Sequence, residues 1–299
     1  MFNYLKLTRP ANILTAMADI FLGFSASGFI LRETGFYGGQ FSLTHTTSLL
    51  FLLLASSCLY AGGIVFNDIF DLNLDKKERP ERPLPSGKIS KQGATIFATI
   101  LLIIGITSAS FVGVYSFVVA INIAAFALLY DSWGKHQSLG PLNMGICRGL
   151  NLLLGLSASP ENLHNVWMLT FIPTIYIATV TMISREEVHG GTTRTLQSAF
   201  ILYAIVILGC LSLSLFPSFT IVTCIPFLLL FSFLIYNPLL QAQKNPSPTQ
   251  IKKVVRAGII SLIILDSALS AGFAGWGYGL LVLALLPISA RLAKLFAVT

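Results

Sequence analysis

The chain has 299 residues, of which 55% are hydrophobic and only 10% are charged, and its mean hydropathy is +0.79. Soluble domains carry roughly 25% charged residues, so this composition excludes an ordinary water-soluble fold and favours a membrane protein. The formal net charge of +7 would suit a nucleic-acid partner, but the cations are spread over the short segments between apolar runs, which argues against that class of partner.

Apolar segments recur along the whole chain, and about 20 such residues suffice to cross a bilayer as a helix. They predict a single integral-membrane domain over residues 1–299, folded as an all-α polytopic bundle of nine to ten transmembrane helices. The first segment is too long for a secretion signal and is expected to stay in the protein. The last two are separated only by the neighbourhood of Gly275, so a single broken or re-entrant element is the alternative there. The expected spans are 13–31, 48–66, 93–112, 114–130, 139–159, 166–183, 195–216, 219–236, 255–273 and 276–293.

Basic residues collect in the cytoplasmic loops of membrane proteins, and this rule gives the expected orientation. With ten spans and a cytoplasmic N-terminus, 17 of the 19 Lys and Arg residues fall on the cytoplasmic side. The exceptions are Arg32, on the far side, and Arg148, inside a span. Nine spans would move Arg291 and Lys294 to the wrong side, so ten are favoured. The protein is therefore expected in a bacterial inner, plasma or organellar membrane, surrounded by membrane lipids.

One stretch, residues 67–90, concentrates charge at the end of the second apolar segment. It holds five of the twelve acidic residues of the chain, among them Asp68, Asp71 and Asp75. Three prolines and a set of cations follow within a few residues: Lys76, Lys77, Arg79, Arg82, Lys88 and Lys91. A solvated loop that ends a helix and fixes the topology is the simplest interpretation of such a run.

The spacing of the three aspartates favours a more specific interpretation. Positions i, i+3 and i+7 fall within about 60° of one another on a helix, so Asp68, Asp71 and Asp75 share one face. Three carboxylates on one face repel unless a cation lies between them, and Mg²⁺ prefers oxygen ligands that it shares with substrate phosphates. Lys and Arg nearby suit the remaining phosphate oxygens. The sequence thus predicts a diphosphate bridged by Mg²⁺ at the membrane surface, with an apolar group extending into the bundle.

The same motif resembles the first signature of the UbiA superfamily of intramembrane prenyltransferases. Asn67-Asp68-x-x-Asp71-x-x-x-Asp75 is followed by Arg82-Pro83-Leu84-Pro85-Ser86-Gly87. The opening Arg9-Pro10-Ala11-Asn12 is similar to the first helix of that family. Tyr130-Asp131-Ser132-x-x-Lys135 resembles its tyrosine–serine–lysine motif, and Cys147-Arg148-Gly149-Leu150-Asn151 is similar to the EboC-like branch. The resemblance extends from residue 9 to about residue 195.

This resemblance implies a helical bundle with a central cavity and a polar cap on the cytoplasmic side. It further implies an Mg²⁺-dependent transfer of a prenyl group from a polyprenyl diphosphate to a lipophilic, aromatic or other, acceptor within the membrane. Asp68, Asp71 and Lys135 would be the catalytic residues, and Tyr130 would support Lys135. The diphosphate would be bound by Asn12, Asn67, Arg82, Tyr130, Lys135 and Arg148. The metal ligands would be Asn67, Asp68, Asp71, Asp75, Glu186 and Glu187.

The second acidic motif departs from the family pattern. The family has two spaced aspartates there, whereas this chain has Ser184-Arg185-Glu186-Glu187, with Ser184 where the first aspartate is expected. The sequence therefore supports Mg²⁺ binding at the first motif more strongly than binding of a second Mg²⁺ at this one. Full catalysis depends on that second ion. His189 is a candidate base for the acceptor, although a solvated loop histidine is the simpler interpretation.

Three ionisable residues fall inside expected spans, where charge is costly and usually faces a cavity. They are Asp19, Arg148 and Asp266, and Arg148 is expected either to pair with one of the two aspartates or to contact the acceptor. The four cysteines lie in apolar segments without metal-ligand spacing, so they are expected to be buried and free.

Two functions compete on these residues. The first is the Mg²⁺-dependent prenyltransferase. The second is a carrier that binds a polyprenyl or other amphipathic lipid without chemistry, which the altered second motif and Arg148 favour. A purely structural membrane scaffold leaves the clustered aspartates without a role.

Overall fold

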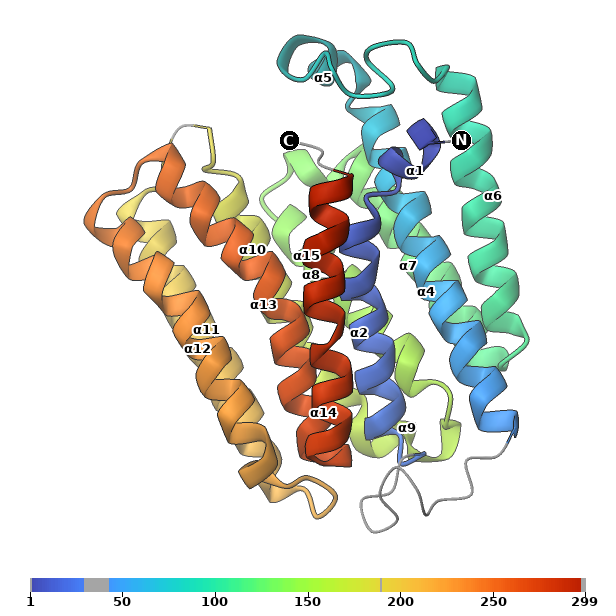
Figure 1. The fold of residues 1–299 in the computed structure, drawn as a ribbon, viewed down its shortest axis with the longest axis vertical. Coiled ribbons are helices and arrows are strands. Elements are labelled where there is room, and N and C mark those ends of the chain that lie inside the picture. The colour runs from blue at the N-terminus through green and yellow to red at the C-terminus, as the bar shows by residue number, and fades with distance from the viewer. Residues whose placement is uncertain (1, 30–42, 189, 297–299) are drawn as a thin grey trace.

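The computed structural model describes residues 2–29, 43–188 and 190–296, so Arg32 and His189 lie outside the described residues. Within these ranges the chain is helical and contains no strand (Figure 1). The α-helices are α1 (Phe2–Leu7), α2 (Pro10–Ala26), α4 (Leu43–Phe70), α5 (Leu72–Glu78), α6 (Lys91–Ser110), α7 (Val114–Ser132), α8 (Gly140–Leu156), α9 (Pro160–Val166), α10 (Phe171–Ser184), α11 (Thr193–Ser212), α12 (Ile221–Lys244), α13 (Pro248–Ala274), α14 (Trp276–Leu283) and α15 (Leu285–Leu295). Short 3₁₀ helices are η2 (Gly134–His136), η3 (Trp167–Thr170) and η4 (Leu213–Leu215).

Eight helical segments of the described chain are long and apolar enough to cross a membrane: 45–70, 91–110, 114–132, 160–184, 193–215, 221–244, 248–274 and 276–295. The other two expected spans coincide with α2 and α8, which have 17 residues each. Both carry polar residues in their middle because they face other helices instead of lipid. The predicted all-helical polytopic bundle is confirmed.

The last two expected spans are separate helices. Gly275, with φ of 86°, follows the end of α13, and α14 then starts back toward the other end of the bundle. α14 and α15 run along α2, and the Ser289 hydroxyl of α15 donates to the Ala11 carbonyl at 2.8 Å. A single broken element is therefore the wrong description of residues 255–293.

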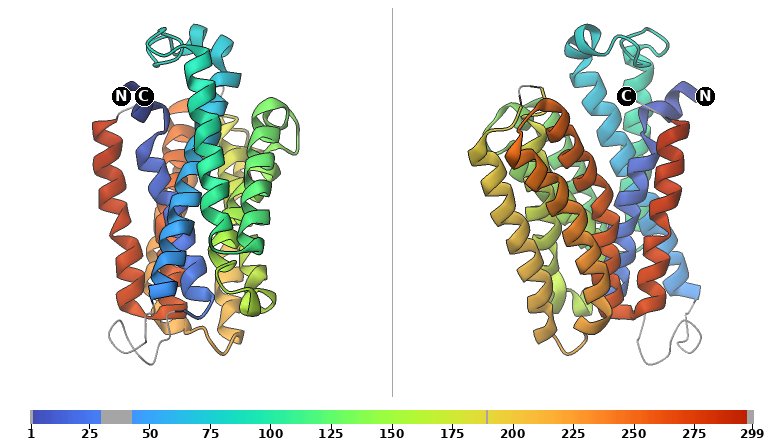
Figure 2. Two further views of the ribbon diagram at one scale, coloured as in Figure 1. Left: turned by 90° about the vertical axis from the view of Figure 1, so that its right-hand side faces the viewer. Right: turned by 60° about the vertical axis from the view of Figure 1, so that its left-hand side comes forward.

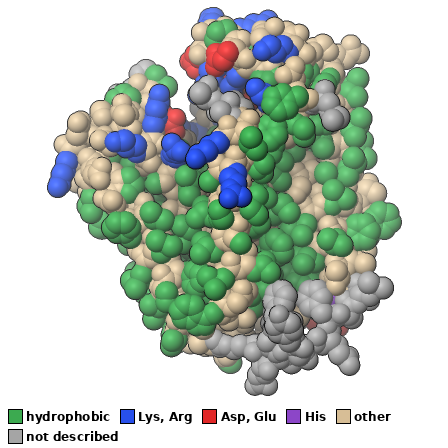
Figure 3. Space-filling model, viewed as in Figure 1, with side chains coloured by type: hydrophobic (Ala, Val, Ile, Leu, Met, Phe, Trp, Pro, Cys, Tyr) green, Lys and Arg blue, Asp and Glu red, His purple; other side chains and the backbone are tan. Residues whose placement is uncertain are grey.

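The charged segments gather at one end of the bundle. In Figure 1 the N-terminus, the C-terminus, α5 and the turn between α10 and α11 all lie at this end. The space-filling view shows Lys, Arg and acidic side chains at the same end, above a largely apolar flank (Figure 3). Such a flank matches what a helix bundle presents to lipid.

Helices α2 and α8 cross so closely that only glycine fits at the contact. A Cβ atom on Gly23 would lie 2.7 Å from the backbone of Gly155, and one on Gly149 would lie 2.2 Å from the Thr174 hydroxyl of α10. Small residues allow such close backbone approach in membrane bundles. α8 is thereby fixed between α2 and α10, at the centre of the molecule.

Two groups of helices flank this centre. One hydrophobic core joins residues of α10 to α13, and another joins residues of α4, α6 and α7. Figure 2 shows the bundle in two further views, in which the last span stands at one edge beside α2. The cavity described next opens between the groups, so its wall is assembled from helices far apart in the sequence.

Candidate active site

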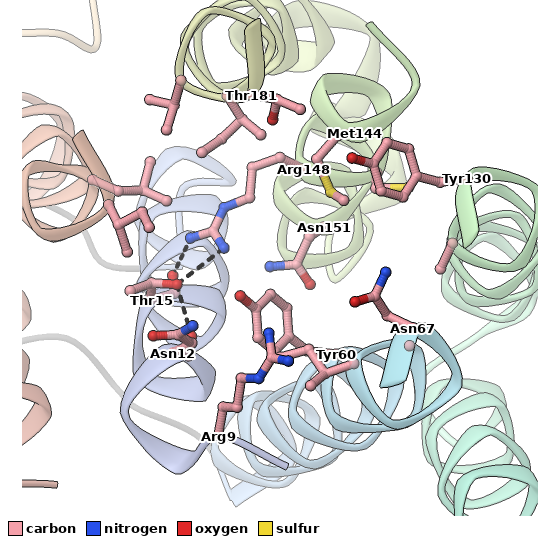
Figure 4. Close-up of a pocket in the computed structure, with 18 of the residues that line it drawn as sticks. Arg9, Asn12, Thr15, Tyr60, Asn67, Tyr130, Met144, Arg148, Asn151 and Thr181 are labelled. Carbon is pink, nitrogen blue, oxygen red and sulfur yellow. Dashed lines mark hydrogen bonds between the residues drawn. The ribbon is translucent and has the colours of Figure 1, made fainter. Parts of the chain in front are cut away.

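A cavity of about 360 Å³ lies between the two groups of helices (Figure 4). Its body is apolar, and polar side chains are placed on its wall at two levels. One set of polar residues, which includes Asn67, Tyr130 and Ser184, lies at the ends of helices at the charged end of the bundle. The apolar lining includes Leu59, Ile64, Ile123, Ala127, Ile177, Val180, Ile259 and Leu262, and the polar lining includes Arg9, Asn12, Thr15, Tyr60, Asn67, Tyr130, Asp131, Arg148, Asn151, Thr181 and Ser184.

The three predicted aspartates follow Asn67, which lines the cavity, in the expected helical register, and none of the three is itself among the lining residues. α4 ends at Phe70, yet the Asp71 amide donates to the Asn67 carbonyl at 2.9 Å and the Asp75 amide to the Asp71 carbonyl at 2.8 Å. The helical spacing therefore continues from α4 into α5. Asp68 and Asp75 are buried, whereas Asp71 is partly accessible.

Each of these carboxylates is held by a cation. Arg9 contacts Asp68 Oδ1 at 2.5 Å from the start of α2, where it has a left-handed backbone with φ of 47°. Arg82 bridges Asp75 at 2.8 Å and Asp68 at 3.5 Å, and Lys135 forms an ion pair with Asp71. The predicted closeness of Arg82 and Lys135 to the aspartates is observed. Arg9 as a partner of Asp68 was not predicted.

One oxygen of each of two aspartates takes part in these contacts. The ion pairs of Asp68 and of Asp71 involve Oδ1, so their Oδ2 atoms form no ion pair with the residues that the structure describes. No cluster of three or more His, Cys, Asp and Glu side chains suited to a metal is formed within the described ranges. This arrangement suits Mg²⁺, which is usually held by one or two carboxylates together with substrate phosphates and water. Asp75 is less suited, since its Oδ2 already accepts from Arg82.

A further carboxylate, Asp131 of α7, lies on the cavity wall and was not predicted as a site residue. It is buried, and its Oδ1 accepts a hydrogen bond of 2.8 Å from the side-chain amide of Asn67. Its place next to Tyr130 in the motif Tyr130-Asp131-Ser132-x-x-Lys135 was the available signal. Asn67, Asn12 and Tyr130, which were predicted, also line the cavity.

The second acidic motif contributes to the site less directly. Ser184 lines the cavity, but both Glu186 oxygens accept hydrogen bonds at the start of α11, from the Thr192 amide at 2.7 Å and the Thr195 hydroxyl at 2.7 Å. Burial raises the pKa of Glu187, and nearby Lys252 and Arg79 oppose that shift. Neither glutamate lines the cavity, and their role as metal ligands stays a prediction.

Arg185 of the same motif has a positional role that the sequence did not reveal. Its guanidinium donates to the backbone carbonyl of Lys135 at 3.0 Å and to that of Gln137 at 2.7 Å. These contacts fix the segment that follows α7, and with it the base of the Lys135 side chain.

Deeper in the bundle, Arg148 forms the buried ion pair that the sequence allowed. Its Nε lies 2.6 Å from Asp19 Oδ2, and its Nη2 lies 4.0 Å from Asp266 Oδ2. Nη1 donates to the Thr15 hydroxyl at 3.2 Å (Figure 4). The side-chain amide of Asn151 donates to Asp19 at 2.8 Å. The guanidinium thus has two carboxylates and the Thr15 hydroxyl as partners. Its predicted contact with a diphosphate remains untested.

Comparison with known proteins places this geometry in a family. A profile of the UbiA prenyltransferase family matches residues 34–252, which is most of the chain. The chain belongs to the UbiA prenyltransferase family. The matched range includes all predicted site residues except Asn12.

Two curated proteins that this chain is similar to are named digeranylgeranylglyceryl phosphate synthase. The protein from Sulfolobus acidocaldarius is 34% identical over 191 residues, and that from Saccharolobus solfataricus is 31% identical over 192 residues. Each alignment covers about 62% of the relative's length and 62–63% of this chain.

Solved structures of UbiA family proteins share the fold. A structure described as digeranylgeranylglyceryl phosphate synthase has a TM-score of 0.69 at 24% identity and covers 91% of this chain and 98% of that one. An apo UbiA homologue from Aeropyrum pernix K1 has a TM-score of 0.69 at 17% identity, covering 86% and 96%. A UbiA homologue from Archaeoglobus fulgidus, bound to GPP and Mg²⁺, has a TM-score of 0.65 at 18% identity, covering 94% and 99%.

Proposed function

We propose that this UbiA family protein transfers a prenyl group from a polyprenyl diphosphate to a lipophilic acceptor within the membrane, in an Mg²⁺-dependent reaction. The observation that carries the proposal is the cavity itself. Its body is apolar, and its wall includes Asn67 and Arg9. Arg9 pairs with Asp68, and Asp71 with its partner Lys135 lies one helical turn beyond Asn67. An apolar chain with a diphosphate at one end matches both parts.

The charges at the mouth suit the departure of a diphosphate. When the bond between the prenyl carbon and the diphosphate oxygen breaks, the electron pair leaves with the oxygen. Arg9, Arg82 and Lys135 lie where they can neutralise this charge, because their aspartate partners hold them at the mouth before substrate binds. Their contacts would pass from carboxylate to phosphate oxygens as the substrate binds.

Asp68 and Asp71 would hold Mg²⁺ through the oxygens that have no ion pair, with Asn67 as a third oxygen ligand. Bound Mg²⁺ would bridge the phosphates and offset the negative charge of the leaving group. The structure described as bound to GPP and Mg²⁺ in the Archaeoglobus homologue supports the choice of ion and ligand. Glu186 and Glu187 are further candidate ligands of the metal ion.

The apolar wall would hold the prenyl chain and exclude water from the reacting carbon. Residues such as Leu59, Ile123 and Ile259 offer no nucleophile that could intercept an allylic cation. The relatives' name describes a glycerol phosphate with two geranylgeranyl groups, so a prenylated glycerol phosphate is the first acceptor to test, beside aromatic ones.

We place the mouth of the cavity, and both termini, on the cytoplasmic side. The distribution of Lys and Arg supports this orientation, since these residues gather at the same end as the aspartates (Figure 3). A water-soluble diphosphate head would then reach the site from the cytoplasm, and the prenyl chain from the bilayer.

A carrier that binds the same ligand without turnover is the second candidate. The observation that favours it is Glu186, whose oxygens are committed to the start of α11, which leaves one acidic motif at the mouth. Both candidates require binding of the diphosphate. They differ in whether the bond to it is broken.

The test uses the purified protein in lipid nanodiscs with labelled geranylgeranyl diphosphate. The acceptor panel contains a prenylated glycerol phosphate, an aromatic acid and a quinone precursor. We expect Mg²⁺-dependent release of diphosphate together with a labelled lipid product, and we expect Asp71→Ala to abolish both. Glu78→Gln, at an exposed carboxylate of α5, is the matched control and should retain activity. Tight binding with no diphosphate release across the panel would refute the transferase and leave the carrier.

A further inference from the structure

Asn67 and Asp131 meet at the cavity wall although 64 residues separate them in the chain. Asn67 comes from the last turns of α4, and Asp131 comes from the last turn of α7. Asp131 is only 4% exposed and lines the cavity. Among the described carboxylates at the charged end of the cavity, Asp68, Asp71 and Asp75 each pair with a cation, whereas Asp131 forms no ion pair.

The contact between these two side chains determines how the Asn67 amide is turned. A carboxylate oxygen that accepts a hydrogen bond faces the amide nitrogen of Asn67 and not its oxygen. The nitrogen, Nδ2, donates to Asp131 Oδ1 at 2.8 Å. The oxygen of Asn67 then points away from Asp131, toward the middle of the cavity (Figure 4).

This orientation matters for a divalent cation. An amide oxygen is a hard ligand for Mg²⁺, whereas an amide NH₂ turned the same way would present hydrogens and repel the ion. Without a fixed acceptor behind it, the Asn67 amide could take either orientation. A carboxylate that holds a metal-binding side chain in one orientation is a recurrent feature of metal sites.

We propose that Asp131 is a positioning residue of this site, which holds the Asn67 amide with its oxygen toward a divalent cation and diphosphate in the cavity. The inference rests on the proposed function, because it takes the cavity mouth as the site of Mg²⁺ and diphosphate. Asp131 itself is assigned no bond to the ion. Its effect on the ion passes through Asn67.

The experiment measures Mn²⁺ binding by electron paramagnetic resonance, with inorganic pyrophosphate present and no prenyl substrate. Asp131→Asn keeps the size of the side chain but allows it to donate as well as accept, so Asn67 is no longer held in one orientation. We expect the Mn²⁺ affinity to fall about tenfold or more, in the range seen when such supporting residues are changed. Glu78→Gln removes one exposed negative charge near the same membrane face, and it should leave the affinity unchanged.

A double-mutant cycle tests whether Asp131 acts through Asn67. In the Asn67→Ala background, Asp131→Asn should cause no further loss of affinity. The exchange variant Asn67→Asp/Asp131→Asn keeps the net charge and the hydrogen bond but reverses its direction. It should bind Mn²⁺ at least as tightly as the wild type, and it stays informative if Asp131→Asn alone does not fold.

The outcomes distinguish a failure of the proposed function from a failure of the positioning role of Asp131. If wild-type protein binds no Mn²⁺ with pyrophosphate, the proposed function fails. If the wild type binds but Asp131→Asn binds equally well, the positioning role is wrong while the proposed function stands. Additive losses in the cycle, or an exchange variant as weak as Asp131→Asn, would also overturn it, because Asp131 would then act independently of Asn67.

Discussion

Replacing Arg148 by Gln should destabilise the protein strongly, whatever its catalytic role. Among the described residues, Arg148 is the cation paired with Asp19 and Asp266, and both aspartates are at most 1% exposed. Removing one partner of a buried ion pair leaves an uncompensated charge and costs about 3–5 kcal/mol. That corresponds to roughly two to four powers of ten in the folding equilibrium.

The structure also predicts which second change restores stability. Asp19 lies 2.6 Å from Arg148, and its neighbour Asn151 can still donate to an amide oxygen at position 19. Asp19→Asn in the Arg148→Gln background removes one of the two buried carboxylates that have lost their cation, so it should recover part of the loss. By contrast, Asp19→Asn alone should be destabilising, since it leaves Arg148 with Asp266 at 4.0 Å as its remaining anion.

The assay is unfolding of the detergent-solubilised protein, followed by tryptophan fluorescence and by size-exclusion chromatography after heating. The folded fraction of each variant is then titrated with pyrophosphate and Mg²⁺. Wild-type stability of Arg148→Gln, or no recovery in the double variant, would refute the assignment of Arg148 to a buried pair. Normal pyrophosphate affinity in the double variant would show that Arg148 is not a diphosphate ligand.

Three further predictions follow from individual contacts. Lys135→Met should weaken pyrophosphate binding about tenfold or more in an isothermal titration, because a charge-assisted hydrogen bond is worth about 1.5–3 kcal/mol, and unchanged affinity would remove Lys135 from the site. Glu186→Ala should lower thermal stability by about 1 kcal/mol, as for the loss of a helix cap, and a parallel fall in Mn²⁺ affinity would identify Glu186 as a metal ligand as well. Gly23→Ala should destabilise the protein by about 1–3 kcal/mol, since the new Cβ would lie 2.7 Å from Gly155. Gly113→Ala, where the space around the new Cβ is open, is the matched control. Equal unfolding temperatures of the two variants would contradict the close crossing of α2 and α8.

Local periodicity was enough to predict much of the fold and part of the site. Each apolar segment of the expected length corresponds to a helix or a pair of consecutive helices, because membrane helices satisfy their hydrogen bonds within the segment. The i, i+3, i+7 spacing placed Asp68, Asp71 and Asp75 in one register, and the backbone hydrogen bonds across Phe70 maintain it. These features depend only on residues close together in the chain.

The partners of each charge could not be predicted in the same way. Arg9 reaches Asp68 across 59 residues, and Lys135 reaches Asp71 across 64. Sequence spacing says nothing about which of several cations meets which carboxylate when they lie on different helices. The two glutamates after α10 show the same limit, because the path of the chain into α11 decided that Glu186 faces Thr192.

The sequence by itself determined the membrane bundle, the aspartate face and the charge that borders it, since composition and helical register require nothing beyond neighbouring residues. The tertiary structure alone decided that Asp131 lies behind Asn67, that Arg148 is neutralised by Asp19, and that a cavity separates the two groups of helices. The physical reason is the packing between helices, with α4 against α7 and with α8 held between α2 and α10. That packing sets distances between side chains from distant segments, and no local pattern in the sequence encodes those distances.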